Sequence, residues 1–127
     1  MATLQLSLKR KWFDMTSPEE KSEDYREVNH YWIKRIMSKK YNEIYPIEQD
    51  AIDGILKHID PKFLVKYHSK PFTTNKMTLG YPKSTDTSRI KEFEHLGIEI
   101  REGREEWGAE KGKLYFVIKH GKRISQC

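Results

Sequence analysis

The chain contains a single cysteine, Cys127, in 127 residues. One thiol cannot form an intramolecular disulfide or supply the several thiolates of a structural zinc site. No apolar run is long enough to cross a membrane, and residues 1–10 alternate apolar and polar side chains instead of forming the apolar stretch of a signal peptide. We therefore expect a cytoplasmic protein without disulfides and without a membrane partner.

The sequence also lacks the short motifs of the common cofactor-dependent classes. It has no P-loop, no dinucleotide-binding glycine pattern and no HExxH, and its histidines are not paired at metal-ligand spacing. These histidines are His30, His58, His68, His95 and His120. Scattered histidines are more typical of surface or packing positions than of ligands, so we expect no metal site and no cofactor.

What the sequence does contain is charge mixed with a regular supply of apolar residues. Charged residues make up 34% and aromatic residues 12%, with a net charge of +5 and a mean hydropathy of −0.86. A chain of this length can bury a core as one domain, and the recurring apolar residues separate it from disordered chains. The positive balance favours an anionic partner such as nucleic acid, although the 19 acidic residues keep the bias modest.

Alternating apolar and polar side chains predict several short strands. In the first, Leu4, Leu6 and Leu8 share one face. Near residue 98 the same alternation puts Glu94 on the face of the apolar residues at 96, 98 and 100, so we expect this carboxylate to face inward. The predicted strands lie at residues 4–9, 21–28, within 63–81, at 94–101 and at 114–119.

Helical spacing and capping residues predict short helices between these strands. A brief helical connection follows Trp12, with Thr16 or Ser17 capping a turn that starts at Pro18. Asn29 is a suitable N-cap for an amphipathic helix that reaches Met37. Apolar spacing predicts another helix at 47–59, an exposed loop at 82–88 and a tight turn at 107–109.

This pattern predicts an α+β fold, a small mostly-β barrel with two or three flanking helices. We expect a single domain over residues 1–127, with a helical insertion at about 29–60 between the second and third strands.

Several blocks resemble the ASCH domain family, whose members are relatives of the PUA fold. The run LSLKRKWFDM at 6–15, followed by EKSEDYRE at 20–27, is similar to the family's opening, and residues 30–35, 103–109 and 115–121 continue the similarity. The family signature is roughly G-x-K-x-x-E-x-R. Here Lys21 and Arg26 match it, whereas Glu19 replaces the glycine and Asp24 the glutamate.

The resemblance implies a PUA-like β-barrel with a polar cleft lined by the signature residues. It also implies two kinds of activity, RNA binding and, in some small members, hydrolysis of the amide of N-acetylated cytidine. The hydrolase members use a lysine, a threonine three positions later and a glutamate from a later strand. Lys21 matches this lysine, but Asp24 occupies the threonine position.

For catalysis, Lys21 could act as a base if its surroundings lowered its pKa from about 10.4. Ser22 or a water would be the nucleophile, Asp24 a general base or orienting group, and Glu94 a second acid. Alternatively, Lys21 and Asp24 form an ion pair that is purely structural.

Binding needs only cations and a stacking ring. Lys21 and Arg26 can contact a phosphate or base edge, Tyr25 can stack on a base, and the basic helix face can follow a backbone. The candidate binding residues are Lys9, Lys21, Tyr25, Arg26, Lys34 and Arg35.

RNA or a modified nucleoside is therefore the expected ligand. The first alternative is an amidohydrolase acting on N-acetylated cytidine-type nucleosides. The second is a protein-interaction module, of phage or host-defence type, that uses the helix at 47–59.

Overall fold

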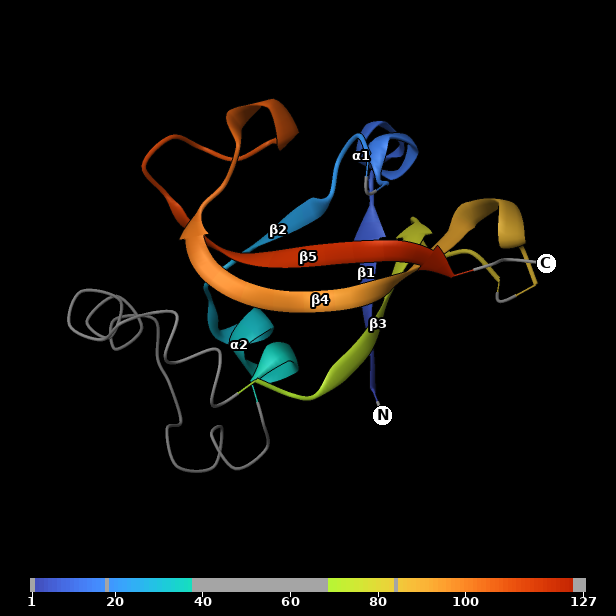
Figure 1. The fold of residues 1–127 in the computed structure, drawn as a ribbon, viewed down its shortest axis with the longest axis horizontal. Coiled ribbons are helices and arrows are strands. Elements are labelled where there is room, and N and C mark those ends of the chain that lie inside the picture. Colours follow the sequence, from blue (N-terminus) through green and yellow to red (C-terminus); the bar gives the residue numbers. More distant parts are fainter. Residues whose placement is uncertain (1, 18, 38–68, 84, 125–127) are drawn as a thin grey trace. The chain divides into compact units, whose positions relative to one another are not determined.

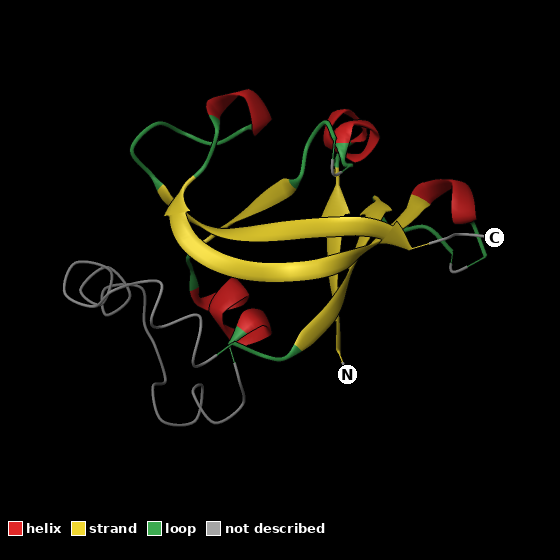
Figure 2. Ribbon diagram, viewed as in Figure 1, coloured by secondary structure: helices red, strands yellow, loops and turns green. Residues whose placement is uncertain are grey.

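The structure, a computed structural model, describes residues 2–17, 19–37, 69–83 and 85–124 (Figures 1 and 2). Most of these residues lie in strands, and two short α-helices accompany them. The elements are β1 (Ala2–Leu8), α1 (Arg10–Met15), β2 (Glu23–Glu27), α2 (His30–Ile36), β3 (Phe72–Leu79), β4 (Ile90–Glu102) and β5 (Leu114–Ile124). Short 3-10 turns lie at Thr87–Arg89 and Glu105–Trp107.

The strands follow the order β1-β3-β4-β5-β2 in one mixed sheet. β1 pairs with β3 in parallel, and β3 pairs with β4 in antiparallel orientation. The prediction of a small, mostly-β α+β fold is therefore confirmed at this coarse level.

The chain divides into two compact units. The first comprises Met1–Asp24, Pro71–Gly97 and Lys119–Cys127, and the second comprises Tyr25–Lys70 and Ile98–Ile118. Strands β2, β4 and β5 contribute residues to both. The expectation of a single domain stays a prediction.

In the first unit, β1 follows the predicted alternation. Leu4, Leu6 and Leu8 are buried while the residues between them are exposed. Their register with β3 sets Leu6 beside the fully buried Met77. Burial of such side chains is worth about 1.5–3 kcal/mol each, so this strand is fixed by its apolar face.

The brief helical connection predicted around Trp12, Phe13 and Met15 is present as α1. α1 ends at Met15, and residues 19–20 form a turn in which the hydroxyl of Ser17 accepts a hydrogen bond of 3.0 Å from the backbone N–H of Glu20, so the predicted Ser17 cap is present; Pro18 itself lies outside the described residues. Thr16 takes an extended backbone conformation, and its hydroxyl donates a hydrogen bond of 2.7 Å to the carbonyl of Trp12. The threonine therefore satisfies a carbonyl of the last helical turn and ends the helix instead of starting one.

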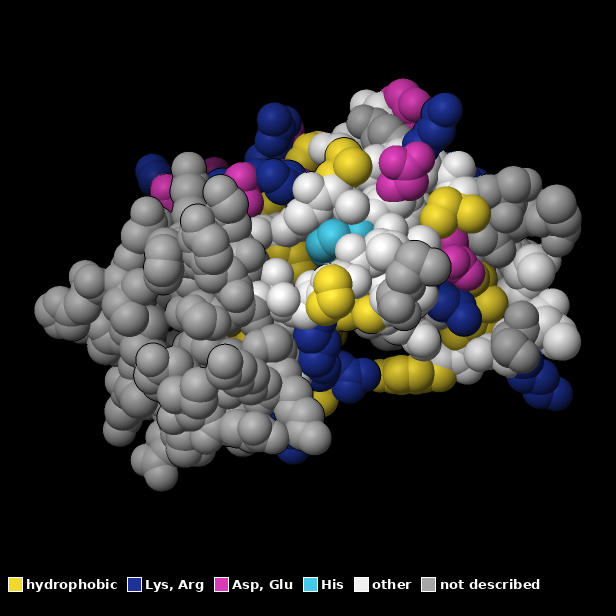
Figure 3. Space-filling view, turned by 60° about the horizontal axis from the view of Figure 1, so that its bottom comes forward, with side chains coloured by type: hydrophobic (Ala, Val, Ile, Leu, Met, Phe, Trp, Pro, Cys, Tyr) yellow, Lys and Arg dark blue, Asp and Glu magenta, His cyan; other side chains and the backbone are white. Residues whose placement is uncertain are grey.

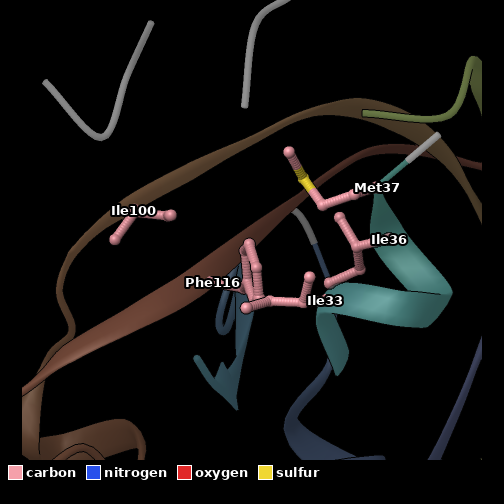
Figure 4. Packing of buried hydrophobic residues seen from close by; sticks show 5 residues of the cluster. All are labelled: Ile33, Ile36, Met37, Ile100 and Phe116. Carbon is pink, nitrogen blue, oxygen red and sulfur yellow. The ribbon is translucent and has the colours of Figure 1, made fainter. Parts of the chain in front are cut away.

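In the second unit, α2 begins where its predicted cap is. The side chain of Asn29 accepts a hydrogen bond of 3.0 Å from the backbone N–H of Trp32, which confirms the N-cap. The apolar face of the helix packs against residues from β4 and β5 (Figure 4). The buried cluster consists of Ile33, Ile36, Met37, Ile100 and Phe116.

The expectation that Glu94 faces inward is wrong. Glu94 is exposed, Leu96 is 59% exposed, and Phe93 on the opposite face is buried. The backbone at Gly97 has φ of +126°, which L side chains rarely adopt, and beyond it the alternation puts Ile100 inside. The pattern read backwards from Ile100 therefore assigns the wrong face to Leu96 and Glu94.

Two further predictions fall on described residues and one does not. The strand expected within 63–81 is present as β3, and the turn at 107–109 is formed with Gly108 in the left-handed region at φ of +96°. The helix predicted at 47–59 lies outside the described residues. No helix in the described part of the chain is long and apolar enough to span a bilayer.

The packing of the second unit makes a stability prediction. Ile36→Ala removes a side chain that is 0% exposed, so we expect it to lower the free energy of unfolding by about 2–5 kcal/mol. Leu96→Ala, at a position that is 59% exposed, should cost less than about 1 kcal/mol. Urea unfolding of the two variants checks this; similar losses would contradict the placement of the core.

Candidate functional site

A buried ion pair lies at the start of β2. Lys21 is 1% exposed and Asp24 is 2% exposed, and the ammonium of Lys21 contacts Oδ1 of Asp24 directly. Nζ of Lys21 also donates to the carbonyl of Glu23 at 2.9 Å and lies 5.9 Å from the centre of the Trp12 ring. The structural interpretation of the Lys21–Asp24 pair as an ion pair is thereby confirmed.

The other carboxylate oxygen of Asp24 is also occupied. Oδ2 lies 2.6 Å from Nε2 of His120, a ring that is 3% exposed and packs 5.6 Å from the ring of Phe93. Nδ1 of His120 lies 2.8 Å from the amide nitrogen of Asn75, which also donates to the carbonyl of Lys119 at 3.1 Å. Both ends of the His120 ring are therefore fixed.

The carbonyl of Lys119 determines the orientation of the Asn75 amide, and with it the direction of the hydrogen bonds that this amide makes to His120 and His95. A carbonyl only accepts, so the amide nitrogen of Asn75 faces it and supplies its second N–H to Nδ1 of His120. Nε2 of His120 carries a proton and donates it to Asp24, because a carboxylate oxygen only accepts. The amide oxygen of Asn75 faces Nδ1 of His95 at 2.6 Å, which must donate.

These contacts form a chain of donors that leads from His95 through Asn75 and His120 to the carboxylate of Asp24, with Lys21 on the other side. All five residues belong to the first unit, and we call them the polar chain. Aligned hydrogen bonds polarise one another in a low-dielectric interior. Among the described residues, no buried side-chain nitrogen or oxygen lacks a partner.

The polar chain fixes the ionisation of its two ends. Burial raises the pKa of Asp24, but the hydrogen bond from His120 and the charge of Lys21 outweigh it and hold the pKa below the ordinary 3.8. Stability from this carboxylate is therefore present at neutral pH and is lost as the pH falls below that value. At the other end burial, followed by the positive charge of Lys119, lowers the pKa of His95 to about 4.

A pocket of about 460 Å³ opens in the same unit, a size typical of small-molecule sites. Its residues come from the end of α1 and the turn after it, the start of β4 and the end of β5. They are Asp14, Thr16, Ser17, Glu19, Glu20, Lys91, Phe93, Lys122 and Arg123. Phe93 lines the pocket and also packs against His120, so the pocket adjoins the polar chain.

Two cations of this pocket, Lys91 and Arg123, repel one another, while the carboxylates of Asp14 and Glu20 attract Lys91 more weakly. Burial is the largest cause of a lowered pKa at Lys91, and the charge of Arg123 is the next. Nζ of Lys91 donates to the carbonyls of Phe13 at 2.8 Å and Asp14 at 3.5 Å, which neutralises no charge. Within the described residues, neither Lys122 nor Arg123 has a hydrogen-bond or ion-pair partner. An anion bound here would relieve this repulsion.

The predicted catalytic residues are only partly brought together. Lys21 and Asp24 meet in the polar chain. Ser22 contributes only its backbone carbonyl, which accepts a hydrogen bond of 2.8 Å from the backbone N–H of His120. Glu94 is exposed and packs beside Gly121 on the outer face, so its expected place as an inward-facing acid is wrong.

Tyr25 and Arg26 have structural contacts in the second unit. The hydroxyl of Tyr25 accepts a hydrogen bond of 2.9 Å from the N–H of Arg104, and its ring packs 5.8 Å from that of Tyr115. The guanidinium of Arg26 donates to the carbonyl of Tyr25 at 2.8 Å and lies 5.2 Å from the ring centre of Trp32.

The other predicted cations lie on exposed positions. Lys9 precedes α1 in the first unit, whereas Lys34 and Arg35 lie on the outer face of α2 in the second. Arg35 lies 4.9 Å over the ring of Tyr31. On the face that Figure 3 shows, basic and acidic side chains are interspersed, in keeping with the modest net charge of +5.

Three members of the polar chain were missed in the sequence. His120 continues the alternation of Phe116 and Ile118, which could have indicated a buried position. Asn75 and His95 carry no such signal, because their partners lie 45 and 20 residues away in the chain. Among the described residues, no group of three or more His, Cys, Asp or Glu could hold a metal ion.

Comparison with known proteins finds no match: no family model, no curated protein and no solved structure matches the chain.

The ion pair makes a prediction about stability. Lys21→Met leaves Asp24 charged and buried, so we expect a loss of about 3–5 kcal/mol in the free energy of unfolding. Adding Asp24→Asn should recover part of this loss, because the amide is neutral and its oxygen can still accept from His120. Lys111→Met removes an exposed lysine and serves as the control. Purely additive losses in denaturant unfolding would argue against a coupled pair.

Proposed function

We propose that the protein binds RNA or a nucleotide through the pocket lined by Lys91, Lys122 and Arg123. The observation that carries the proposal is the convergence of these three cations on one pocket, where none of them forms a contact ion pair with a carboxylate among the described residues, although Asp14 and Glu20 attract Lys91 at longer range. Nucleic-acid phosphates are the anions that such clusters bind most commonly in basic proteins. The pocket volume suits a single nucleotide unit.

Binding is favoured over amide hydrolysis by the state of Lys21. A general base must be neutral and able to reach the substrate, whereas this ammonium is 1% exposed and paired with an ionised carboxylate. The side chain at position 24 is occupied on both oxygens, by Lys21 and His120. These contacts support a structural role for the signature residues.

The resemblance to ASCH domains supports the same ligand class. The similarity implies a PUA-like barrel and RNA binding, and a mixed sheet with short helices is compatible with it. In this proposal the signature residues hold the fold, and the ligand lies at the neighbouring pocket instead of at Tyr25 or Arg26.

The experiment compares two variants of equal net charge. Lys122→Gln with Arg123→Gln removes two pocket cations, and Lys83→Gln with Lys111→Gln removes two exposed lysines elsewhere. For a fluorescent eight-nucleotide RNA with a 5′-phosphate, we expect the pocket variant to bind at least about tenfold more weakly, and its salt dependence to be shallower. Fluorescence anisotropy at several salt concentrations measures both.

Equal weakening by the two variants would show diffuse attraction and would contradict the proposed site, as would no binding by the wild type. N-acetylated cytidine incubated with the wild type should remain unchanged in chromatography. Its deacetylation would favour the hydrolase alternative.

A further inference from the structure

The donors around the pocket indicate how a phosphate would be held, and the argument rests on the proposed function. The ammonium of Lys91 has three hydrogens, of which two point to the carbonyls of Phe13 and Asp14. Nζ also lies 4.7 Å from the centre of the Phe13 ring, and the described part of the chain supplies no third hydrogen-bond acceptor for it. One charged N–H is therefore left for a ligand in the pocket.

Ser17 supplies a second donor of a different kind. Its oxygen accepts a hydrogen bond of 3.0 Å from the backbone N–H of Glu20, so the oxygen is fixed while the hydroxyl hydrogen has no acceptor among the described residues. The hydroxyl of Thr16, in contrast, donates its hydrogen bond to the carbonyl of Trp12 at 2.7 Å. The serine, unlike the threonine, can donate into the pocket.

Lys122 and Arg123 add exposed cationic donors from the end of β5. Together the lining offers one N–H of Lys91, one O–H of Ser17, the ammonium of Lys122 and the guanidinium of Arg123. A phosphodiester within a strand has two terminal oxygens, whereas a phosphomonoester has three and carries about −1.5 to −2 charge at neutral pH. The donor set therefore matches a monoester better than an internal phosphate.

The acidic part of the lining strengthens this preference. Asp14, Glu19 and Glu20 line the same pocket and would repel a chain of several phosphates passing through it. A single terminal phosphate needs only the basic part. We infer that the pocket takes the terminal phosphate of an RNA end or of a nucleoside monophosphate, and does not hold the interior of a strand.

The test uses three RNA oligonucleotides of one sequence, with a 5′-phosphate, with a 3′-phosphate and with hydroxyls at both ends. We expect one phosphorylated form to bind at least about tenfold more tightly than the hydroxyl form. The variant Lys122→Gln with Arg123→Gln should abolish this preference, whereas Lys83→Gln with Lys111→Gln should keep it. Because both pairs change exposed residues, loss of folding does not confuse the comparison.

The outcomes distinguish recognition of a terminal phosphate from RNA binding at the pocket. Equal binding of all three RNAs by the wild type, still weakened selectively by the pocket variant, would overturn terminal-phosphate recognition and leave RNA binding in place. Absence of binding to any of them would overturn both. The NMR signals of the His120 ring, which packs against the pocket residue Phe93, should shift on addition of the preferred RNA.

Discussion

The ionised carboxylate of Asp24, held between Lys21 and His120, is the interaction on which the first unit depends. An isolated buried charge would cost several kcal/mol, so its neighbours must supply both an opposite charge and a proton donor. His120 can donate only from Nε2, which leaves Nδ1 to accept from Asn75 and turns the Asn75 oxygen toward His95. One charge thus orders side chains from β2, β5, β3 and β4.

The same charge decides what Lys21 can do. Lys21 is held as an ammonium by Asp24 and is almost completely buried, so it acts on the fold and is unavailable to a ligand. The cations of the pocket are in the opposite situation, because none of them forms a contact ion pair among the described residues and they line a pocket open to a ligand. Phe93 connects the two regions, since it lines the pocket and packs on His120. A rigid polar chain beneath a cationic pocket is an arrangement suited to binding an anion at a fixed position.

Local patterns in the sequence predicted the local parts of this structure. The alternation at Leu4, Leu6 and Leu8 and the cap at Asn29 depend on neighbours within a few residues, and both are confirmed. The ion pair of Lys21 and Asp24 was one of two predicted alternatives, because Lys and Asp side chains close together in the sequence commonly pair, and it is present. Their partner His120 lies 96 residues from Asp24, and no short-range signal connects them.

The error at Glu94 has a different origin. Alternation assigns faces correctly only while the strand is regular, and the positive φ at Gly97 interrupts it. The pocket could not be predicted either, because its residues come from α1, β4 and β5 and meet only through the order of the strands in the sheet.

The most direct test of the central claim is a two-bond ¹H–¹⁵N correlation spectrum of the histidine side chains, recorded between pH 7 and pH 4. The account predicts that Nε2 of His120 carries a proton, which it donates to Asp24, and that Nδ1 accepts from Asn75. It also predicts that His95 is neutral with its proton on Nδ1 and becomes charged only as the pH approaches about 4. A His120 ring with its proton on Nδ1, or a His95 that titrates near the ordinary 6.5, would contradict the polar chain that Asp24 organises.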